Sequence, residues 1–282
     1  MINLVTTFQP LVDEKFSQEA KSSILSSQNF SWTGAHSIKL YKISTSPMAD
    51  YDRAGTNTAT NWSRYGAVAS LDATTEELTL TRDRSFTFCI DALDSDETAQ
   101  QLSAASALER ELREVAIPEI DSYLFGVACD KAGAKPAELA LTPQNIYGEI
   151  IKGSLALDNA QVPDSPRYLV VSPQTYYIMK QSANILLSGT EVAADMAIRG
   201  VIGTLDGLTV VKVPASRLPA GFGFLVLSPE ALVCPTKLQD FQTHLNPPGL
   251  SGTLVEGRLV YDCFALDNKL KGLYYQAQPV KA

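Results

Sequence analysis

The clearest alternation of apolar and polar positions runs along residues 77–91. The apolar positions share one parity and the polar positions share the other: Leu78, Leu80, Phe86, Phe88 and Ile90 against Thr79, Thr81, Asp83, Ser85, Thr87 and Asp91. Successive side chains of a strand point to opposite faces, so the pattern predicts one long strand with an apolar and a wet face. Its predicted partner is residues 37–43, which are rich in β-branched and aromatic side chains. The apolar parity of this partner changes after Leu40, which predicts a β-bulge there.

The connection between these two strands covers residues 44–76 and is dense in Ser, Thr, Asn, Gly and Asp. A connection this long is usually either disordered or functional. Tyr51, Trp62 and Tyr65 favour function, because bulky aromatic side chains are scarce in disordered linkers and enriched where surfaces meet partners. We therefore predict that this connection contacts another chain.

The acidic cluster DALDSDE precedes a long one-sided helix. A calcium loop would need a glycine at its sixth position and a distant bidentate glutamate, and both are missing. A capping box fits instead, with Asp94 as the N-cap and Glu97 three residues later. Apolar residues then follow at helical spacing: Leu102, Ala105, Leu108, Leu112 and Val115. Pro118 should bend the helix or restart it near Ile117, and Gly126 marks a possible end.

A second apolar stripe recurs every four residues near the N-terminus, at Val12, Phe16, Ala20 and Ile24. It predicts a helix that follows Pro10. A helix with so narrow an apolar stripe has two possible placements, and the sequence does not decide between them. The helix either packs on its own domain as an ordinary surface helix or forms an arm that lies on a neighbouring subunit.

The second half of the chain alternates helices and strands. Thr142 is the predicted cap of a helix over residues 142–157. A buried strand then precedes a helix that starts at Ser172, and Asp206 with Gly207 forms the predicted turn of a hairpin. A further buried strand and a short helix follow, and two strands joined by a turn near Asn268 complete the pattern.

Composition narrows the class of protein. An apolar content of 45% is enough for a sizeable core, whereas charged residues make up only 19% of the chain. This charged fraction is below the roughly 25% that is usual, which suggests that much of the surface is covered by association. The net charge of −8 argues against a reader of nucleic acid, whose surface would carry a basic patch. The N-terminal residues lack the basic and apolar regions of a signal peptide, and no apolar run is long enough to span a bilayer, so we expect a cytosolic protein.

The sequence holds little material for catalysis. The chain has only two histidines, His36 and His244, and neither stands near a cysteine or an acidic pair in sequence. No phosphate-binding or nucleophile-elbow motif is present. The four cysteines stand far apart in sequence, with no zinc-type spacing, and are expected to be buried reduced thiols: Cys89, Cys129, Cys234 and Cys263.

The order of these elements resembles that of the major capsid proteins of tailed bacteriophages. The segments that carry the resemblance, in this order, are DRSFTFCIDALDSDET, PEIDSY, RYLVVSPQTYYIMK and GRLVYDCFALDNKLKGLYY, and the resemblance covers nearly the whole chain. None of these segments is a catalytic signature, so its specificity rests on their order and spacing. The resemblance implies an α+β fold of the tailed-phage major capsid type.

The resemblance also implies a division of the chain. Residues 1–35 would form an N-terminal arm, and residues 36–93 an extended β-hairpin loop that reaches over a neighbour. Residues 94–166 and 240–282 would form a peripheral domain with a long spine helix, and residues 167–239 an inserted α/β axial domain. The long strand would then project beyond its own domain, held to the spine helix by its apolar face.

The implied function is self-assembly into pentamers and hexamers of an icosahedral shell, a virion capsid that encloses double-stranded DNA non-specifically. Expected partners are copies of the chain itself, a scaffolding protein and a portal, with assembly in the host cytoplasm. No enzymatic activity, catalytic residue, cofactor, metal or membrane is expected. The candidate residues for contacts between subunits are Phe16, Tyr41, Tyr51, Arg53, Trp62, Arg64 and Tyr65. The candidate structural residues are Asp94, Glu97, Pro118, Glu119 and Asp121.

Three other functions compete with this one. An encapsulin-type compartment shares the fold and closes into small shells around enzyme cargo. A hydrolytic enzyme would need a turnover that is abolished by substituting His244. A fibre or binding module would stay a soluble monomer in the presence of a scaffold. The resemblance favours the capsid hypothesis over these three functions.

Overall fold

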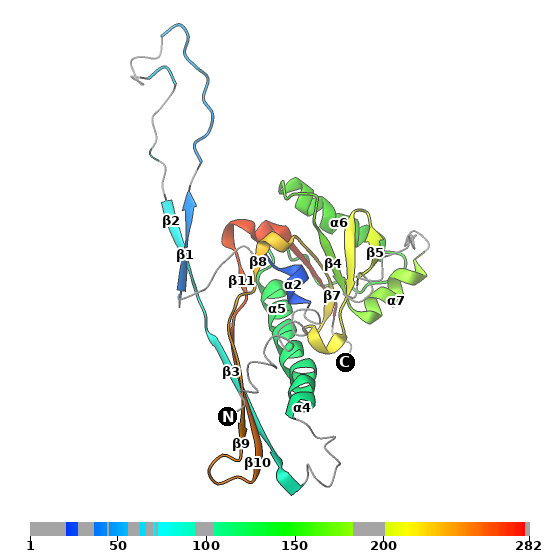
Figure 1. The fold of residues 1–282 in the computed structure, drawn as a ribbon. Helices are drawn as coiled ribbons and strands as arrows, with labels where there is room; N and C mark the ends of the chain where they lie inside the picture. Colours follow the sequence, from blue (N-terminus) through cyan, green and yellow to red (C-terminus); the bar gives the residue numbers. More distant parts are fainter. Residues whose placement is uncertain are drawn as a thin grey trace. The chain divides into compact units, whose positions relative to one another are not determined.

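A computed structural model describes residues 21–27, 37–43, 45–55, 63–65, 70, 73–93, 104–182 and 201–279 (Figure 1). The chain divides into two compact units, Gly34–Leu80 and a larger unit made of Met1–Thr33 with Thr81–Ala282. The finer division into arm, loop, peripheral and axial domains stays a prediction. The predicted capping residues Asp94 and Glu97 lie outside the described residues.

The smaller unit, called the hairpin unit below, contains strands β1 (Ser37–Ile43) and β2 (Ala73–Thr79). They pair antiparallel in one unbroken register, so the predicted bulge near Leu40 is wrong. The reason lies in Tyr41, whose side chain is 75% exposed although it is aromatic. The strand keeps its alternation, and Tyr41 belongs to the exposed face, whereas Leu40 lies on the half-buried one.

The predicted strand over residues 77–91 is two strands in two sheets. Its first part belongs to β2, which pairs with β1 as predicted. Its second part is β3 (Arg82–Asp91), which pairs antiparallel with β10 (Gly252–Tyr261) instead. The apolar and polar side chains keep alternating from β2 into β3, so the sequence pattern does not show that the strand is divided. Cys89 lies on the exposed face of β3, so the expectation of a buried thiol is wrong there.

The larger unit holds a three-stranded sheet of order β3-β10-β9, in which β9 (Thr236–Leu245) was not predicted. Phe86 of β3 and Phe241 of β9 lie opposite the same residue of β10, Gly257. A Cβ atom at Gly257 would overlap the Phe86 ring. This glycine therefore lets the Phe86 ring pack across the middle strand, as aromatic residues do beside glycines in sheets.

The predicted long helix packs on this sheet as three consecutive segments: α4 (Ala104–Glu111), the π-helical turn η1 (Leu112–Ala116) and α5 (Ile117–Lys131). A helical segment restarts at Ile117, as predicted from Pro118. The wide turn adds a residue to the helical period, so Val115 is 49% exposed and Ala116 is buried in its place. The predicted stripe is therefore wrong at Val115.

The helix does not end at Gly126, because α5 continues to Lys131. Its second half adds buried residues on both sides of that glycine, including Leu124, Phe125 and Ala128. Burial of this apolar stripe outweighs the low helix propensity of one glycine. The helix thus reaches two cores: its first part packs on the three-stranded sheet and its second part on a five-stranded sheet.

The five-stranded sheet has the order β12-β7-β4-β6-β5. Its strands are β4 (Tyr168–Val171), β5 (Val201–Leu205), β6 (Leu208–Lys212), β7 (Phe222–Leu227) and β12 (Leu273–Ala277). The predicted hairpin is β5–β6, and its turn residues Asp206 and Gly207 both have positive φ, 47° and 77°. Edge strand β12 comes from the end of the chain, outside the predicted axial range 167–239.

Helices cover both faces of this sheet. The core on one face includes residues of α5 and of the short helix α2 (Ser22–Leu25). The core on the other face includes residues of α6 (Ile146–Asn159) and α7 (Pro173–Gln181). Alternate residues of β4 enter opposite cores, Val170 on the α5 side and Leu169 on the α6 side. The predicted start of α7 is confirmed, since Ser172 accepts a hydrogen bond from the Thr175 amide.

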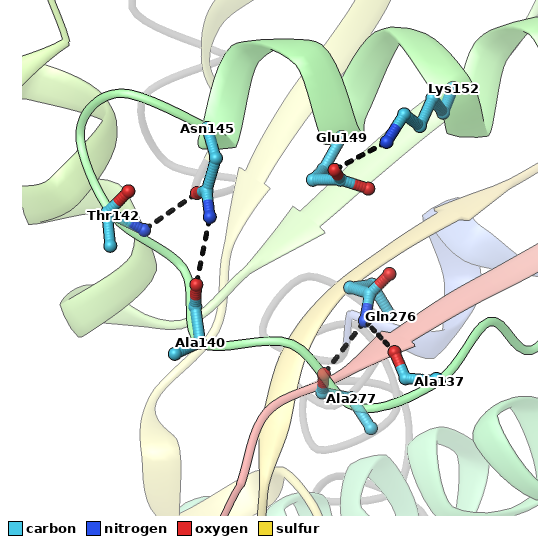
Figure 2. A network of polar contacts seen from close by, with 8 residues as sticks. All are labelled: Ala137, Ala140, Thr142, Asn145, Glu149, Lys152, Gln276 and Ala277. Carbon is cyan, nitrogen blue, oxygen red and sulfur yellow. Dashed lines mark hydrogen bonds and ion pairs between the residues drawn. The ribbon is translucent and has the colours of Figure 1, made fainter.

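Helix α6 begins later than predicted, at Ile146, so the prediction of Thr142 as its cap is wrong (Figure 2). Asn145 orders the preceding turn: its Oδ1 accepts from the Thr142 amide at 2.8 Å, and its Nδ2 donates to the Ala140 carbonyl at 3.0 Å. Gln276 of β12 ties the same connection to the sheet by donating to the Ala137 carbonyl at 2.9 Å.

Short elements complete the fold. Their bounds are η2 (Ala215–Arg217), η3 (Pro229–Ala231), β8 (Leu232–Val233), β11 (Phe264–Ala265) and η4 (Asp267–Gly272). The two strands predicted around Asn268 are β10 and β12, but they belong to different sheets and do not pair with each other. Between them, β11 pairs with β8 and the helical turns of η4 lead into β12.

Candidate functional site

The predicted contact residues that the structure describes lie in the hairpin unit, and all of them are exposed: Tyr41, Tyr51, Arg53, Arg64 and Tyr65. The tyrosines are 75%, 51% and 80% exposed, in that order. Phe16 and Trp62 lie outside the described residues. Contact of these side chains with another subunit stays a prediction. Their exposure is what such a contact requires.

Two parts of the long connection meet in the hairpin unit. The rings of Tyr51 and Tyr65, called the tyrosine pair below, lie edge to face with their centroids 5.0 Å apart. The Asp52 amide donates to the Arg64 carbonyl at 2.9 Å, and the Gly55 amide donates to the Asp52 carboxylate at 2.8 Å. The connection is therefore locally ordered around an aromatic pair that the unit itself leaves exposed.

The hairpin unit buries Leu78 and Leu80 at the end of its second strand but leaves other large apolar side chains exposed. Met48 is fully exposed, beside the exposed tyrosine pair in sequence. An ion pair between Lys42 and Glu76, 3.1 Å apart, adds support across the two strands. A two-stranded hairpin is only marginally stable in water by itself. Exposed aromatic residues on such a support are typical of a surface that packs against a partner.

A buried carboxylate holds the first residue after the hairpin unit. Asp262 is 4% exposed, and its Oδ2 accepts from both the amide and the hydroxyl of Thr81, each at 2.8 Å. Its Oδ1 accepts from the Tyr123 hydroxyl and from the Cys263 amide, also at 2.8 Å each. We call Thr81, Tyr123 and Asp262 the root cluster. Burial, and then the hydrogen bond to Asp262, raises the pKa of Tyr123.

No sequence pattern predicted this cluster. Its one available signal is the acidic residue in the otherwise apolar stretch LVYDCFAL, because a charge in such a stretch needs hydrogen-bond partners. The partners themselves could not be found, since Thr81 and Tyr123 are 181 and 139 residues away along the chain.

Glu119, a predicted structural residue, joins three elements. Its carboxylate accepts from the Arg84 guanidinium of β3 at 2.7 Å and from the Tyr261 hydroxyl of β10 at 3.1 Å. Burial and then the negative charge of Glu119 raise the pKa of Tyr261 to about 12, so the hydroxyl stays a donor. A second pair, Arg258 with Asp83, spans β10 and β3 through two hydrogen bonds.

Asp121, another predicted structural residue, is completely buried in α5. Its Oδ2 accepts from Arg217 Nη1 at 2.8 Å, which joins α5 to η2. A buried carboxylate needs such a partner, because burial without one costs several kcal/mol. Nearby, burial lowers the pKa of Lys21, and the negative charge of Asp121 partly offsets this effect.

The described residues offer little for catalysis. His244 Nε2 of β9 lies 3.5 Å from Glu256 Oε2 of β10, and both side chains are about half exposed. The sequence did not predict this contact. Within the described ranges, no group of three or more His, Cys, Asp or Glu residues could hold a metal ion. No helix in the same ranges is long and apolar enough to cross a membrane.

Comparison with known proteins finds likeness in structure alone. No protein-family model and no curated protein matches the sequence. A structure from Mycobacterium phage Che8 is 17% identical, covers 90% of both chains and has a TM-score of 0.66. The capsid structure of cyanophage P-SCSP1u is 13% identical, covers 88% of this chain and 85% of its own, and has a TM-score of 0.65.

A virus-like particle from Pyrococcus furiosus is also similar. It is 9% identical, covers 98% of this chain and 100% of its own, and has a TM-score of 0.59. All three alignments span both chains almost from end to end, so the likeness concerns the order and packing of the whole chain. The fold expected from the order of sequence segments is thus confirmed: the chain has the α+β fold of tailed-phage major capsid proteins, which a virus-like particle protein shares.

Proposed function

We propose that this chain is a major capsid protein that assembles into pentamers and hexamers of an icosahedral shell around double-stranded DNA. Fold by itself does not establish function, so the proposal rests on the candidate site. The observation that carries it is the hairpin unit, a separate compact unit that presents an exposed tyrosine pair on a two-stranded support. A neighbouring copy of the chain would cover this surface.

The chain's charge supports the same proposal. Its net charge is −8, whereas a protein that binds DNA tightly would present a concentrated basic surface. An acidic shell can enclose DNA without binding it tightly. We propose a scaffolding protein and a portal as further partners, a virion capsid as its location and the host cytoplasm as the place of assembly. Catalysis has no place in this function.

The same fold supports a second function, an encapsulin-type compartment that encloses protein cargo. The observation in its favour is the end-to-end likeness to the Pyrococcus furiosus virus-like particle. The two functions differ in what the shell contains. Particles that hold nucleic acid favour the capsid, and particles that hold a host or neighbouring enzyme favour the compartment.

The test is assembly of the purified protein, expressed alone and with a scaffolding protein encoded beside it, followed by light scattering and negative-stain imaging. Closed shells, or rings of five and six subunits, are the expected result. A stable monomer under both conditions would remove the main support for a shell protein while leaving the fold unchanged.

A deletion of residues 48–70 tests the role of the hairpin unit. It spares both strands, since β1 ends at Ile43 and β2 begins at Ala73. We expect a subunit that unfolds cooperatively but no longer closes into shells. Loss of cooperative unfolding would mean instead that the connection belongs to the core of the subunit.

A smaller change than the deletion replaces Tyr51 and Tyr65 with serine, and Met48→Ser is its matched control. All three side chains are exposed, but only the tyrosines form the aromatic pair. We expect the double variant to assemble at least tenfold more slowly than the control, because aromatic side chains dominate contact surfaces. Equal assembly of the two variants would contradict a role of the tyrosine pair in the interface.

A further inference from the structure

Two cysteines that are far apart in sequence meet in the larger unit. The Sγ atoms of Cys234 and Cys263 lie 2.9 Å apart. Cys263 is buried, whereas Cys234 is partly exposed, and both are free thiols. Such a short separation shows that the two side chains point at one another. The shell function proposed above gives this contact no role.

The strand register explains why they meet. Strands β8 and β11 pair Leu232 with Ala265 and Val233 with Phe264. Continued by one residue, the same register places Cys234 opposite Cys263. The register does continue, because the Asp262 amide donates to the Pro235 carbonyl at 3.2 Å, which is the next pair.

The hydrogen-bond pattern also defines the type of pair. The Leu266 amide donates to the Ala231 carbonyl, and the Asp262 amide to the Pro235 carbonyl. Hydrogen-bonded and non-hydrogen-bonded pairs alternate along antiparallel strands, so Cys234 and Cys263 form a non-hydrogen-bonded pair. In such pairs the Cα atoms are about 4.5 Å apart, which lies within the range that a disulfide spans.

We propose that Cys234 and Cys263 form an intramolecular disulfide when the protein meets an oxidising solution, through exchange with a low-molecular-weight disulfide such as oxidised glutathione. The bond would close the root of the β9–β10 hairpin, because β8 leads into β9 and β11 follows β10.

The exchange balances in two steps. The Cys234 thiolate, which is the partly exposed one, attacks a sulfur of oxidised glutathione, forms a mixed disulfide and releases one glutathione thiolate. The hydrogen bond to Cys234 and burial raise the pKa of Cys263, so the second step relies on the contact that holds its sulfur against that of Cys234. The Cys263 sulfur attacks the Cys234 sulfur, gives up its proton to the departing glutathione thiolate and releases the second glutathione. The two protein thiols together lose two protons and two electrons, and one oxidised glutathione is reduced to two glutathione molecules.

The setting in which this bond would form rests on the proposed function. A shell assembled in a reducing cytoplasm would keep both thiols, whereas a released virion surface is an oxidising environment in which disulfides persist. The bond would therefore lock the subunit after assembly and would not compete with folding. The disulfide itself needs no shell, so it can be tested on the unassembled chain.

The test compares the Cys89→Ser chain before and after treatment with oxidised glutathione. This substitution removes the exposed thiol, which could otherwise link two molecules. The fourth thiol, Cys129, is buried, which keeps oxidised glutathione from reaching it, and burial also raises its pKa to about 12. We expect a mass loss of about 2 Da, the two hydrogens removed when one disulfide forms. A non-reduced tryptic digest should contain residues 218–237 linked to residues 259–269.

The same sample should melt about 6 °C higher than the reduced chain, because the bond closes a loop of about 30 residues in the unfolded state. Reduction should reverse both changes, and the matched Cys234→Ser chain should show neither. Persistence of two alkylatable thiols, or a mixed disulfide with glutathione alone, would overturn the proposal.

These outcomes are independent of assembly. Shells that form without the linked peptide would overturn the disulfide and leave the shell function. A linked peptide in a chain that never assembles would support the disulfide and count against the shell function.

Discussion

Replacing Asp262 with alanine tests the root cluster, the set of contacts that holds the first residue after the hairpin unit. Four donors converge on this carboxylate: the Thr81 amide and hydroxyl, the Tyr123 hydroxyl and the Cys263 amide, each at 2.8 Å. The alanine variant leaves all four without this acceptor, in a place where Asp262 is only 4% exposed. The loss is therefore much larger than that of a surface hydrogen bond.

The magnitude follows from opposing contributions. Each hydrogen bond to a charged group contributes about 1.5–3 kcal/mol, whereas removing a buried carboxylate recovers part of its desolvation cost. We expect the Asp262→Ala chain to lose about 3–5 kcal/mol of its free energy of unfolding. Tyr123→Phe removes one hydroxyl and should cost about 1–2 kcal/mol.

The assay is urea unfolding of the unassembled chain, with the midpoint and the slope of the transition measured for each variant. A double-mutant cycle of Asp262→Ala and Tyr123→Phe isolates their interaction. If the hydrogen bond is as described, the tyrosine substitution should cost almost nothing once Asp262 is gone, which gives a coupling of about 1–2 kcal/mol. Additive losses in the two single variants would refute this reasoning.

Two further predictions concern single side chains of the larger unit, and both are read from urea midpoints. Gly148→Ala should stabilise α6 by about 0.5–1 kcal/mol, because its Cβ meets nothing within 4 Å. The same change at Gly153 should be less favourable by about 1 kcal/mol or more, since its Cβ would lie 3.0 Å from the buried Tyr274 ring; equal effects at the two sites would contradict this. Asp121→Asn should cost about 3 kcal/mol, because it leaves the Arg217 charge without its buried partner; a loss below about 1 kcal/mol would show that the pair contributes little.

Much of the local structure was predictable because it depends on neighbours in the chain. The start of α7 at Ser172 and the β5–β6 turn at Asp206 follow from short-range hydrogen bonding and backbone preference. The restart of the helix at Ile117 follows from the missing N–H group of Pro118. The order of such segments also sufficed to identify the fold.

The errors occurred where partners distant in sequence decide the outcome. The alternation over residues 77–91 is real, but β2 and β3 separate at a residue that Asp262 holds. The exposure of Val115 follows from a π-helical turn, and neighbouring spacing does not reveal that turn. Helix α6 begins at Ile146 and not after Thr142, and the side chain of Asn145 orders the turn between them.

For the candidate site, the sequence by itself determined which segment carries the candidate contact residues, because composition marks a long connection with too many aromatic side chains to be a simple linker. The exposure of these side chains was decided by the structure. Only the tertiary structure decided that Tyr51 meets Tyr65, that Thr81 meets Asp262 and that Cys234 meets Cys263. The physical reason is that local preferences act within a few residues, whereas these contacts depend on strand register and on packing between segments that the chain brings together only when it folds.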